Sequence, residues 1–231
     1  MKHLFFDLDR TLWDFDKNSE SALEILYDQL DLHNHLRSFR SFHTKYKKIN
    51  ADLWYQYAKG RITKDELRTK RFRDTFAHFD VKSEELTSKM ADGYINLSPY
   101  QTRLFPNALE TLTALKEDNF ELHIITNGFK EVQFIKLEKS GLLPYFDIIL
   151  CSEEVGRNKP ARIVFDTALE RANAKVSESI MIGDSYEADI KGAENAGMRS
   201  ILFDPAREHR EGAHKWHIHS LDQIPDTLTW M

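Results

Sequence analysis

Two aspartates, Asp7 and Asp9, follow an apolar run near the N-terminus and are the first residues of the chain whose spacing suggests chemistry. The run from Leu4 to Phe6 is typical of a buried strand, and the carboxylates come where that strand ends. Two carboxylates this close repel each other unless a cation lies between them. The pair could supply a metal ligand, a nucleophile and a general acid or base, although a plain acidic turn would show the same residues.

Polar side chains also follow later apolar runs. Thr126 and Asn127 come after one run, Asp184 comes after another, and Lys159 precedes a predicted helix. Ligands of open parallel sheets bind outside the carboxyl ends of the strands. We therefore expect one site at one edge of a sheet, built from seven residues: Asp7, Asp9, Thr126, Asn127, Lys159, Asp184 and Asp189.

The residue types at this expected site favour phosphoryl transfer. Asp7, Asp184 and the main-chain carbonyl of Asp9 are hard oxygen ligands of the kind that Mg²⁺ prefers. Asp7 could attack phosphorus and form an aspartyl phosphate. Asp9 could protonate the leaving alkoxide and then accept a proton from the hydrolytic water.

The phosphate itself would be held by Thr126, Asn127 and Lys159, which can contact its oxygens and neutralise the charge that spreads in the transition state. Taken singly, Lys159 could be a surface lysine and Asp189 a charge at a helix N-terminus. Together, at these spacings, they predict a catalytic site for a small-molecule phosphate monoester.

The segment from residue 19 to residue 98 shows helical periodicity only. Ser21 to Glu24 and Thr63 to Glu66 have the spacing of capping boxes, Gly60 resembles a helix stop, and Ser83 could begin a fourth helix. Apolar residues recur at steps of three and four throughout, which predicts a bundle with an aromatic core.

From Pro106 onward, predicted strands alternate with predicted helices, which is typical of a parallel sheet with right-handed crossovers. The fold class expected is α/β, a Rossmann-like parallel sheet in residues 1–15 and 100–231, with an all-helical domain inserted at residues 16–99. Strands are predicted at residues 120–125, 146–151, 179–182 and 199–203, and helices at 106–118, 130–140, 160–173 and 220–230.

Composition excludes several classes of protein. The chain has 231 residues, 41% of them hydrophobic, and a formal net charge of −5, which argues against binding of a nucleic-acid polymer. Apolar runs are too short for a spanning helix, and no secretory signal is apparent, so we expect no membrane partner. The single cysteine, Cys151, cannot form an internal disulfide, which fits the cytoplasm. The spacing of His214, His217 and His219 matches no zinc template, and we predict no metal there.

The motif order resembles the four-motif signature of the haloacid dehalogenase superfamily. The motifs are the Asp-x-Asp-x-Thr run from Asp7, Thr126-Asn127-Gly128, Lys159-Pro160, and Gly183-Asp184 with Asp189. The resemblance implies Asp7 as nucleophile, Asp9 as acid/base, Thr126 and Lys159 at the phosphate, Mg²⁺ at Asp184 with Asp189 supporting its shell, and a small helical cap of the C1 type. Arg10 departs from the pattern, which most often has glycine there, and is assigned no role.

A narrower resemblance covers nearly the whole chain and concerns the pyrimidine 5′-nucleotidases of this superfamily. It is carried by Leu53-Trp54, Tyr57 and the run Gly60 to Thr63, by Gln133 and the run Lys136 to Glu138, and by the run Ser152 to Gly156. It implies hydrolysis of nucleoside 5′-monophosphates, preferentially pyrimidine ones.

Three other functions fit parts of the pattern. A 2-haloacid dehalogenase shares the fold, but a halide leaves without a proton, so that chemistry does not need Asp9. A phosphosugar phosphatase or mutase keeps the same aspartates and differs mainly in the cap. A non-enzymatic binding module is the least favoured, since none of the catalytic groups is missing.

Overall fold

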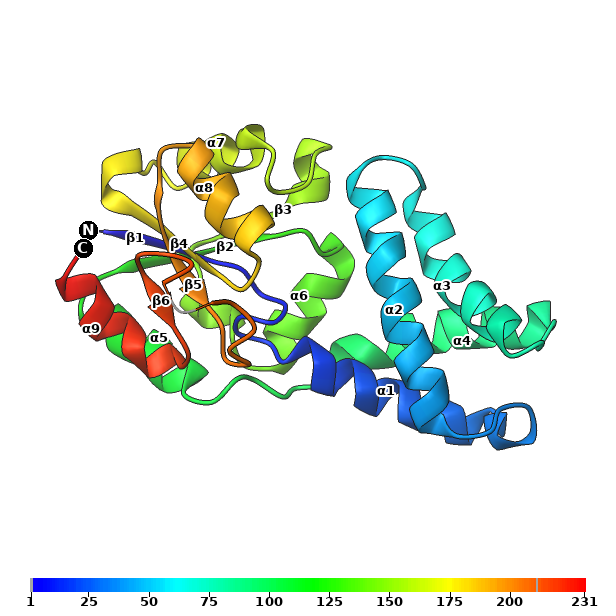
Figure 1. The fold of residues 1–231 in the computed structure, drawn as a ribbon. Helices are drawn as coiled ribbons and strands as arrows, with labels where there is room; N and C mark the ends of the chain where they lie inside the picture. Colours follow the sequence, from blue (N-terminus) through cyan, green and yellow to red (C-terminus); the bar gives the residue numbers. More distant parts are fainter. Residues whose placement is uncertain (1, 211) are drawn as a thin grey trace. The chain divides into compact units, whose positions relative to one another are not determined.

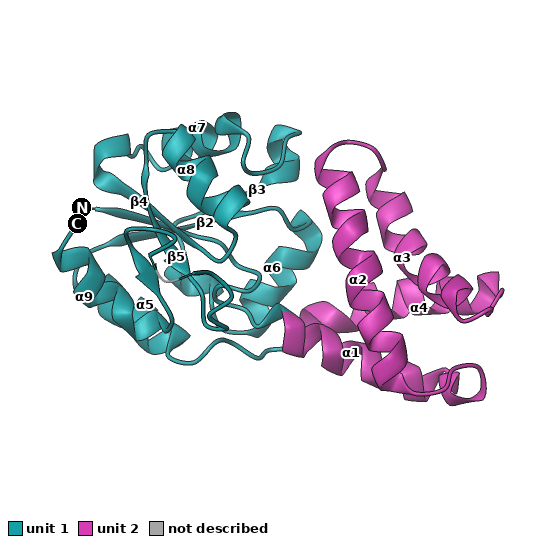
Figure 2. Ribbon diagram, viewed as in Figure 1, with its two compact units in different colours: residues 1–15, 102–231 teal, residues 16–101 magenta. Residues whose placement is uncertain are grey.

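The computed structural model describes residues 2–210 and 212–231. The chain forms two compact units, one of residues 1–15 and 102–231 and the other of residues 16–101 (Figure 2). The second unit is helical in all its regular elements and is inserted after the first strand. The predicted fold class, α/β with an all-helical insertion, is confirmed.

A six-stranded sheet forms the centre of the first unit, with strand order β3-β2-β1-β4-β5-β6 and parallel pairing throughout (Figure 1). Strand β1 lies between β2 and β4, so the residues after it are flanked by the carboxyl ends of two neighbours. The strands are β1 His3–Phe6, β2 Glu121–Thr126, β3 Ile148–Cys151, β4 Ser179–Gly183, β5 Arg199–Phe203 and β6 His217–Ile218.

Helices cover both faces of this sheet because alternate strand residues point to opposite faces. Leu4 and Phe6 belong to a buried cluster that includes residues of α5, α6 and α9, whereas Phe5 belongs to a cluster with residues of α7 and α8 (Figure 1). The helices are α5 Ala108–Glu117, α6 Lys130–Lys139, α7 Arg162–Arg171, α8 Lys191–Asn195 and α9 Ile224–Thr229.

Four helices build the second unit: α1 Phe15–Gln29, α2 Phe39–Ala58, α3 Lys64–His78 and α4 Glu84–Leu97. α1 begins at the junction of the two units. Aromatic rings fill the core of the second unit, and the Tyr46 and Phe72 rings stack with centroids 5.3 Å apart.

Three of the four helix boundaries predicted in this unit are found, including the helix stop at Gly60, which has a φ of 67° and follows the end of α2. Thr63 and Glu66 form both halves of a capping box, and Ser83 accepts a hydrogen bond from the amide of Leu86. The predicted box at Ser21 is wrong, because α1 already begins at Phe15 and Ser21 lies inside it.

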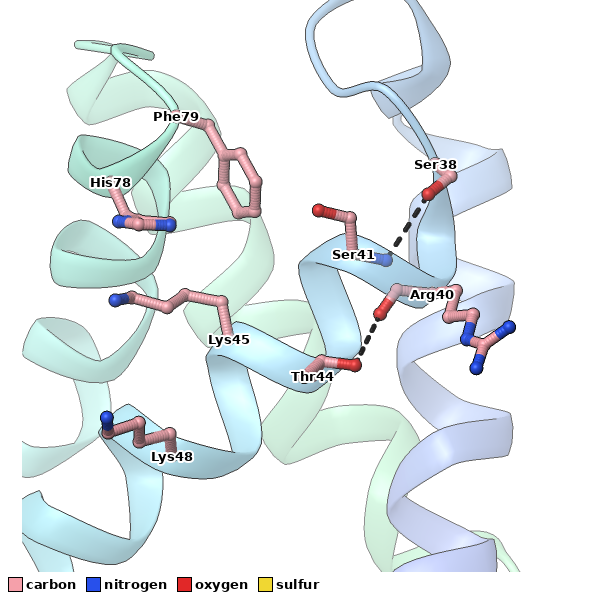
Figure 3. Close-up of a pocket in the computed structure, with 8 residues that line it drawn as sticks. All are labelled: Ser38, Arg40, Ser41, Thr44, Lys45, Lys48, His78 and Phe79. Atoms are coloured by element: carbon pink, nitrogen blue, oxygen red, sulfur yellow. Dashed lines mark hydrogen bonds between the residues drawn. The ribbon is translucent and has the colours of Figure 1, made fainter.

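A pocket of about 450 Å³ lies in the second unit, lined by residues of α2, of its N-terminal approach and of the end of α3. In Figure 3 the Lys45 and Lys48 side chains extend from α2 toward the helix that carries His78. The lining contains no carboxylate: it consists of Ser38, Arg40, Ser41, Thr44, Lys45, Lys48, His78 and Phe79. Lys45 and Lys48 are like charges three residues apart on α2, and such a pair lowers the stability of a helix by roughly a few tenths of a kcal/mol.

Candidate active site

Lys159 lies at the centre of the polar cluster beyond the carboxyl ends of the strands. Its Nζ atom is 2.7 Å from Asp7 Oδ1 and 2.6 Å from Asp189 Oδ1, and it donates a third hydrogen bond to the carbonyl of Ile125 at 2.7 Å. The side chain is buried. All three donors of this ammonium group are therefore used inside the protein, which fixes its position.

Asp184 completes a group of three carboxylates. Oxygen atoms of Asp7, Asp184 and Asp189 all lie within 4.8 Å of one another. Thr11 holds Asp184 from one side, since its hydroxyl donates to Asp184 Oδ1 at 3.3 Å and accepts from the Asp184 amide at 3.1 Å. Two buried carboxylates and one half-buried carboxylate thus gather around one buried lysine.

The protonation of the cluster reflects this imbalance. Burial raises the pKa of Asp7 to about 7, against the opposing effect of Lys159. Burial also raises the pKa of Asp184 well above its usual range, and the Asp7 and Asp189 charges add to the rise. Burial alone would lower the pKa of Lys159, but the Asp189 and Asp7 carboxylates outweigh it and raise that pKa. The site is short of positive charge, and its hard oxygen donors fit a divalent cation such as Mg²⁺.

Asp189 is held inside the cluster by two contacts. One of its oxygens binds Lys159, and the other accepts a hydrogen bond from the Ser185 amide at 3.0 Å. Gly183 is required beside it, because a Cβ at that position would lie 2.3 Å from Asp189 Oδ2. Both oxygens of Asp189 are engaged by the protein, so this residue is placed to support the cluster.

The Asp9 side chain has different partners from the other three aspartates. Gln133 Nε2 donates to Asp9 Oδ2 at 2.9 Å, and Lys136 Nζ lies 2.5 Å from Asp9 Oδ1. Among the described residues, the carboxylates that gather within ligand distance are Asp7, Asp184 and Asp189, without the Asp9 side chain. Asp9 therefore lies at the same edge of the sheet, but its carboxylate is bound by two side chains of α6.

Gln133 and Lys136 are site residues to which the sequence analysis assigned no role. Gln133 is fully buried, and its Nε2 also donates to Thr126 Oγ1 at 2.7 Å. The Lys136 ammonium group is also buried, 4.2 Å from the centre of the Trp13 ring. Their spacing of three residues, shortly after Thr126, places them on one face of the predicted helix. The sequence alone does not show that this face is buried.

Thr126 is the last residue of β2 and Asn127 follows it, and their side chains have different hydrogen-bond partners. Thr126 Oγ1 accepts hydrogen bonds from the Gly128 amide and from Gln133. Asn127 Oδ1 accepts from the Lys159 amide at 2.8 Å, and its Nδ2 donates to the Lys159 carbonyl at 3.2 Å. The Asn127 side chain therefore positions the Lys159 backbone, a contact that the predicted phosphate role did not include.

Arg10, where the superfamily resemblance led us to expect glycine, adopts a left-handed backbone with a φ of 67°. That region is open to glycine without steric cost and is unfavourable for other residues. The Arg10 guanidinium carbon lies 4.4 Å from the centre of the Phe15 ring, and a cation–π contact of this kind stabilises the side chain position.

The fold and the site define a hydrolase class. A family model for haloacid dehalogenase-like hydrolases matches residues 4–203, and the chain belongs to that family. The resemblance inferred from the motifs is confirmed. Separately, among the described residues no helix is both long and apolar enough to cross a membrane.

Relatives of known activity narrow the comparison. The chain is 35% identical to pyrimidine 5′-nucleotidase YjjG of Escherichia coli over 97% of its length and 96% of that protein. It is 31% identical to pyrimidine 5′-nucleotidase PynA of Streptococcus pneumoniae, covering 98% and 94% of the two chains. It is also 32% identical to a ribulose-1,5-bisphosphate 5-phosphatase of Halopiger xanaduensis, covering 89% and 85%.

A solved structure matches over the whole fold. The putative HAD-hydrolase YfnB of Bacillus subtilis, crystallised with magnesium, superposes with a TM-score of 0.88 at 28% identity and covers 99% of this chain and 98% of its own.

Proposed function

We propose that the protein is a Mg²⁺-dependent phosphatase that forms an aspartyl phosphate on Asp7. The observation that carries the proposal is the group of three carboxylates, Asp7, Asp184 and Asp189, gathered around the buried Lys159 at the end of the central strand. Asp7, Asp184 and the main-chain carbonyl of Asp9 would hold the ion, with Asp189 behind them. When bound, Mg²⁺ would neutralise the carboxylates and the phosphate so that they can approach each other.

In this mechanism a carboxylate oxygen of Asp7 attacks phosphorus, a bond forms between them, and the ester P–O bond breaks. Asp9 gives its proton to the leaving alkoxide and afterwards takes one from the water that hydrolyses the acyl phosphate. Thr126 and Lys159 stabilise the charge on the phosphate oxygens. Gln133 and Lys136 keep the Asp9 carboxylate in one position, as their hydrogen bonds to it support.

The proposal also assigns a different role to each of the two units. Residues 1–15 and 100–231 form the catalytic core, and residues 16–99 form the cap that selects the substrate. The single cysteine is buried and forms no disulfide, which is consistent with the cytoplasmic location that we propose.

The substrate we propose is a nucleoside 5′-monophosphate, preferentially a pyrimidine one. Two nucleotidases at 35% and 31% identity over nearly the whole chain support it. Of the cap rings that could stack on a base, Phe72 is fully buried in the helical core, whereas Tyr55 is exposed. A phosphosugar substrate is the second candidate, because a sugar-bisphosphate phosphatase is similarly related.

Phosphate release from a panel of substrates tests the proposal: pyrimidine and purine monophosphates, sugar phosphates, phosphoglycolate and a 2-haloacid. We expect the highest kcat/KM with dUMP, dTMP or UMP, no turnover in excess EDTA, and no turnover by Asp7→Asn. A higher kcat/KM for sugar phosphates would replace the nucleotidase assignment with the phosphosugar one. Full activity in EDTA, or halide release alone, would refute the phosphatase mechanism itself.

A further inference from the structure

A second cluster of ligating side chains lies at the opposite, amino end of the sheet. His3 on β1 pairs in register with Glu121 on β2, and Phe5 pairs with His123, so these side chains share one face of the sheet. His3 Nδ1 is 3.2 Å from His123 Nε2 and 3.5 Å from Glu121 Oε2. One ligand atom from each of His3, Glu121 and His123 lies within 4.8 Å of the others.

The two separations from His3 Nδ1 are close to those between neighbouring ligand atoms of a small transition metal. Zinc binds imidazole nitrogen and carboxylate oxygen at about 2.0–2.2 Å, which places neighbouring ligand atoms of a tetrahedral site about 3.3 Å apart. We propose that His3, Glu121 and His123 form a second metal site, for Zn²⁺ or a similar borderline divalent ion, distinct from the carboxylate site of Asp7. Imidazole ligands favour zinc, cobalt and nickel over magnesium, so the two sites take different metals.

The state of the side chains suits them as ligands. Both histidines are buried, and each can offer a ring nitrogen to a metal. The Glu121 side chain is 38% exposed, so an ion can enter from solvent on that side.

Groups around the cluster add support. Lys2 Nζ lies 2.6 Å from the other oxygen of Glu121 and orients that carboxylate, as outer partners of metal ligands do. The Phe5 ring lies 4.6 Å from the His123 ring and forms an apolar wall beside the ligands.

A third cluster, formed by Asp204, His217 and His219, serves as a comparison. There the Asp204 carboxylate already accepts hydrogen bonds from the amides of Glu208 and His209, both at 2.9 Å, and His219 Nδ1 lies 2.7 Å from the Asp204 carbonyl. Its ligand atoms are used by the loop itself. It therefore provides a matched control of the same residue types.

Cobalt titration tests the proposal, because Co²⁺ in a site with imidazole ligands absorbs visible light with a pattern that depends on its geometry. Metal-free protein carrying Asp184→Asn, which weakens the carboxylate site, should bind one equivalent of Co²⁺ with a tetrahedral-type spectrum, and Zn²⁺ should displace it. Glu121→Gln and His123→Gln should each weaken binding at least about 100-fold, since a direct ligand matters more than a supporting contact. His217→Gln should leave binding unchanged.

Glu121→Gln keeps the volume of a half-exposed side chain, so it tests the site even if His123→Gln does not fold. Absence of Co²⁺ binding, or equal affinity in Glu121→Gln and the parent, would overturn the proposal and leave a histidine–histidine hydrogen bond as the whole account. Phosphatase activity with Mg²⁺ should be unaffected by Glu121→Gln, which separates a failure of this proposal from a failure of the proposed function.

Discussion

Gly128→Ala should reduce turnover strongly, although Gly128 itself is not a proposed catalytic residue. A Cβ at position 128 would lie 2.3 Å from both Cδ and Nε2 of Gln133, where ordinary contact begins at 3.4 Å. The Gln133 amide must therefore retreat by about 1 Å, which breaks its hydrogen bonds to Asp9 and Thr126.

The size of the effect follows from those two hydrogen bonds. The one to the Asp9 carboxylate contributes about 1.5–3 kcal/mol and the one to the Thr126 hydroxyl about 0.5–1.5 kcal/mol. A displacement of about 1 Å at a supporting residue can reduce turnover about 100-fold. We expect kcat for p-nitrophenyl phosphate to fall by about that factor, and thermal melting to show a loss of a few kcal/mol.

A double-mutant cycle isolates the cause. Gln133→Ala removes the atoms that the new Cβ would meet, so Gly128→Ala should cost almost nothing further in that background. Gly141→Ala is the control, since a Cβ there meets nothing within 4 Å and only the positive φ of 74° is penalised. Independent, additive effects of Gly128→Ala and Gln133→Ala, or an active Gly128→Ala enzyme, would refute the reasoning.

Three further outcomes are expected. Mg²⁺ should bind more weakly as pH falls through about 7, because burial raises the pKa of Asp7 to about 7 and the protonated carboxyl must lose its proton before it can bind the ion. Calorimetry in two buffers of different ionisation enthalpy should detect this proton release. An affinity for Mg²⁺ that does not change with pH would contradict the prediction. Lys136→Met should reduce kcat about 10-fold or more while the protein stays folded by circular dichroism, because Asp9 loses its ion pair; wild-type kcat would exclude a positioning role. Cys151 should resist thiol reagents at pH 8 and react in guanidinium, because burial raises the pKa of its thiol to about 12.

Strand positions could be predicted closely because buried parallel strands are short apolar runs that end abruptly. Residues 199–203 were predicted as the strand that is observed, and the run predicted at 120–125 is found one residue later. Strand β6 was missed, since two residues in a polar tail carry no periodicity. Its pairing with β5 depends on tertiary contact alone.

Some residues of the site could be predicted from the sequence, and others could not. Asp7 and Asp184 can be recognised because each follows an apolar run, and Lys159 because it directly precedes a predicted helix. Gln133 and Lys136 do not, because a polar residue on a helix usually faces water, and only packing shows that these two are buried. The Lys159 amide donates a hydrogen bond to the Asn127 side chain, and these residues are 32 positions apart, so no local sequence pattern could predict the contact.

The central place of β1 in the sheet has a consequence for the order of folding during synthesis. The four residues of β1 are made before both of their partners, Glu121–Thr126 and Ser179–Gly183, which follow more than a hundred residues later. Residues 16–101 have their own core and emerge in between, so they can fold while β1 is still unpaired. Because closing these long loops costs conformational entropy, we expect assembly of the sheet to be slower than folding of the helical unit.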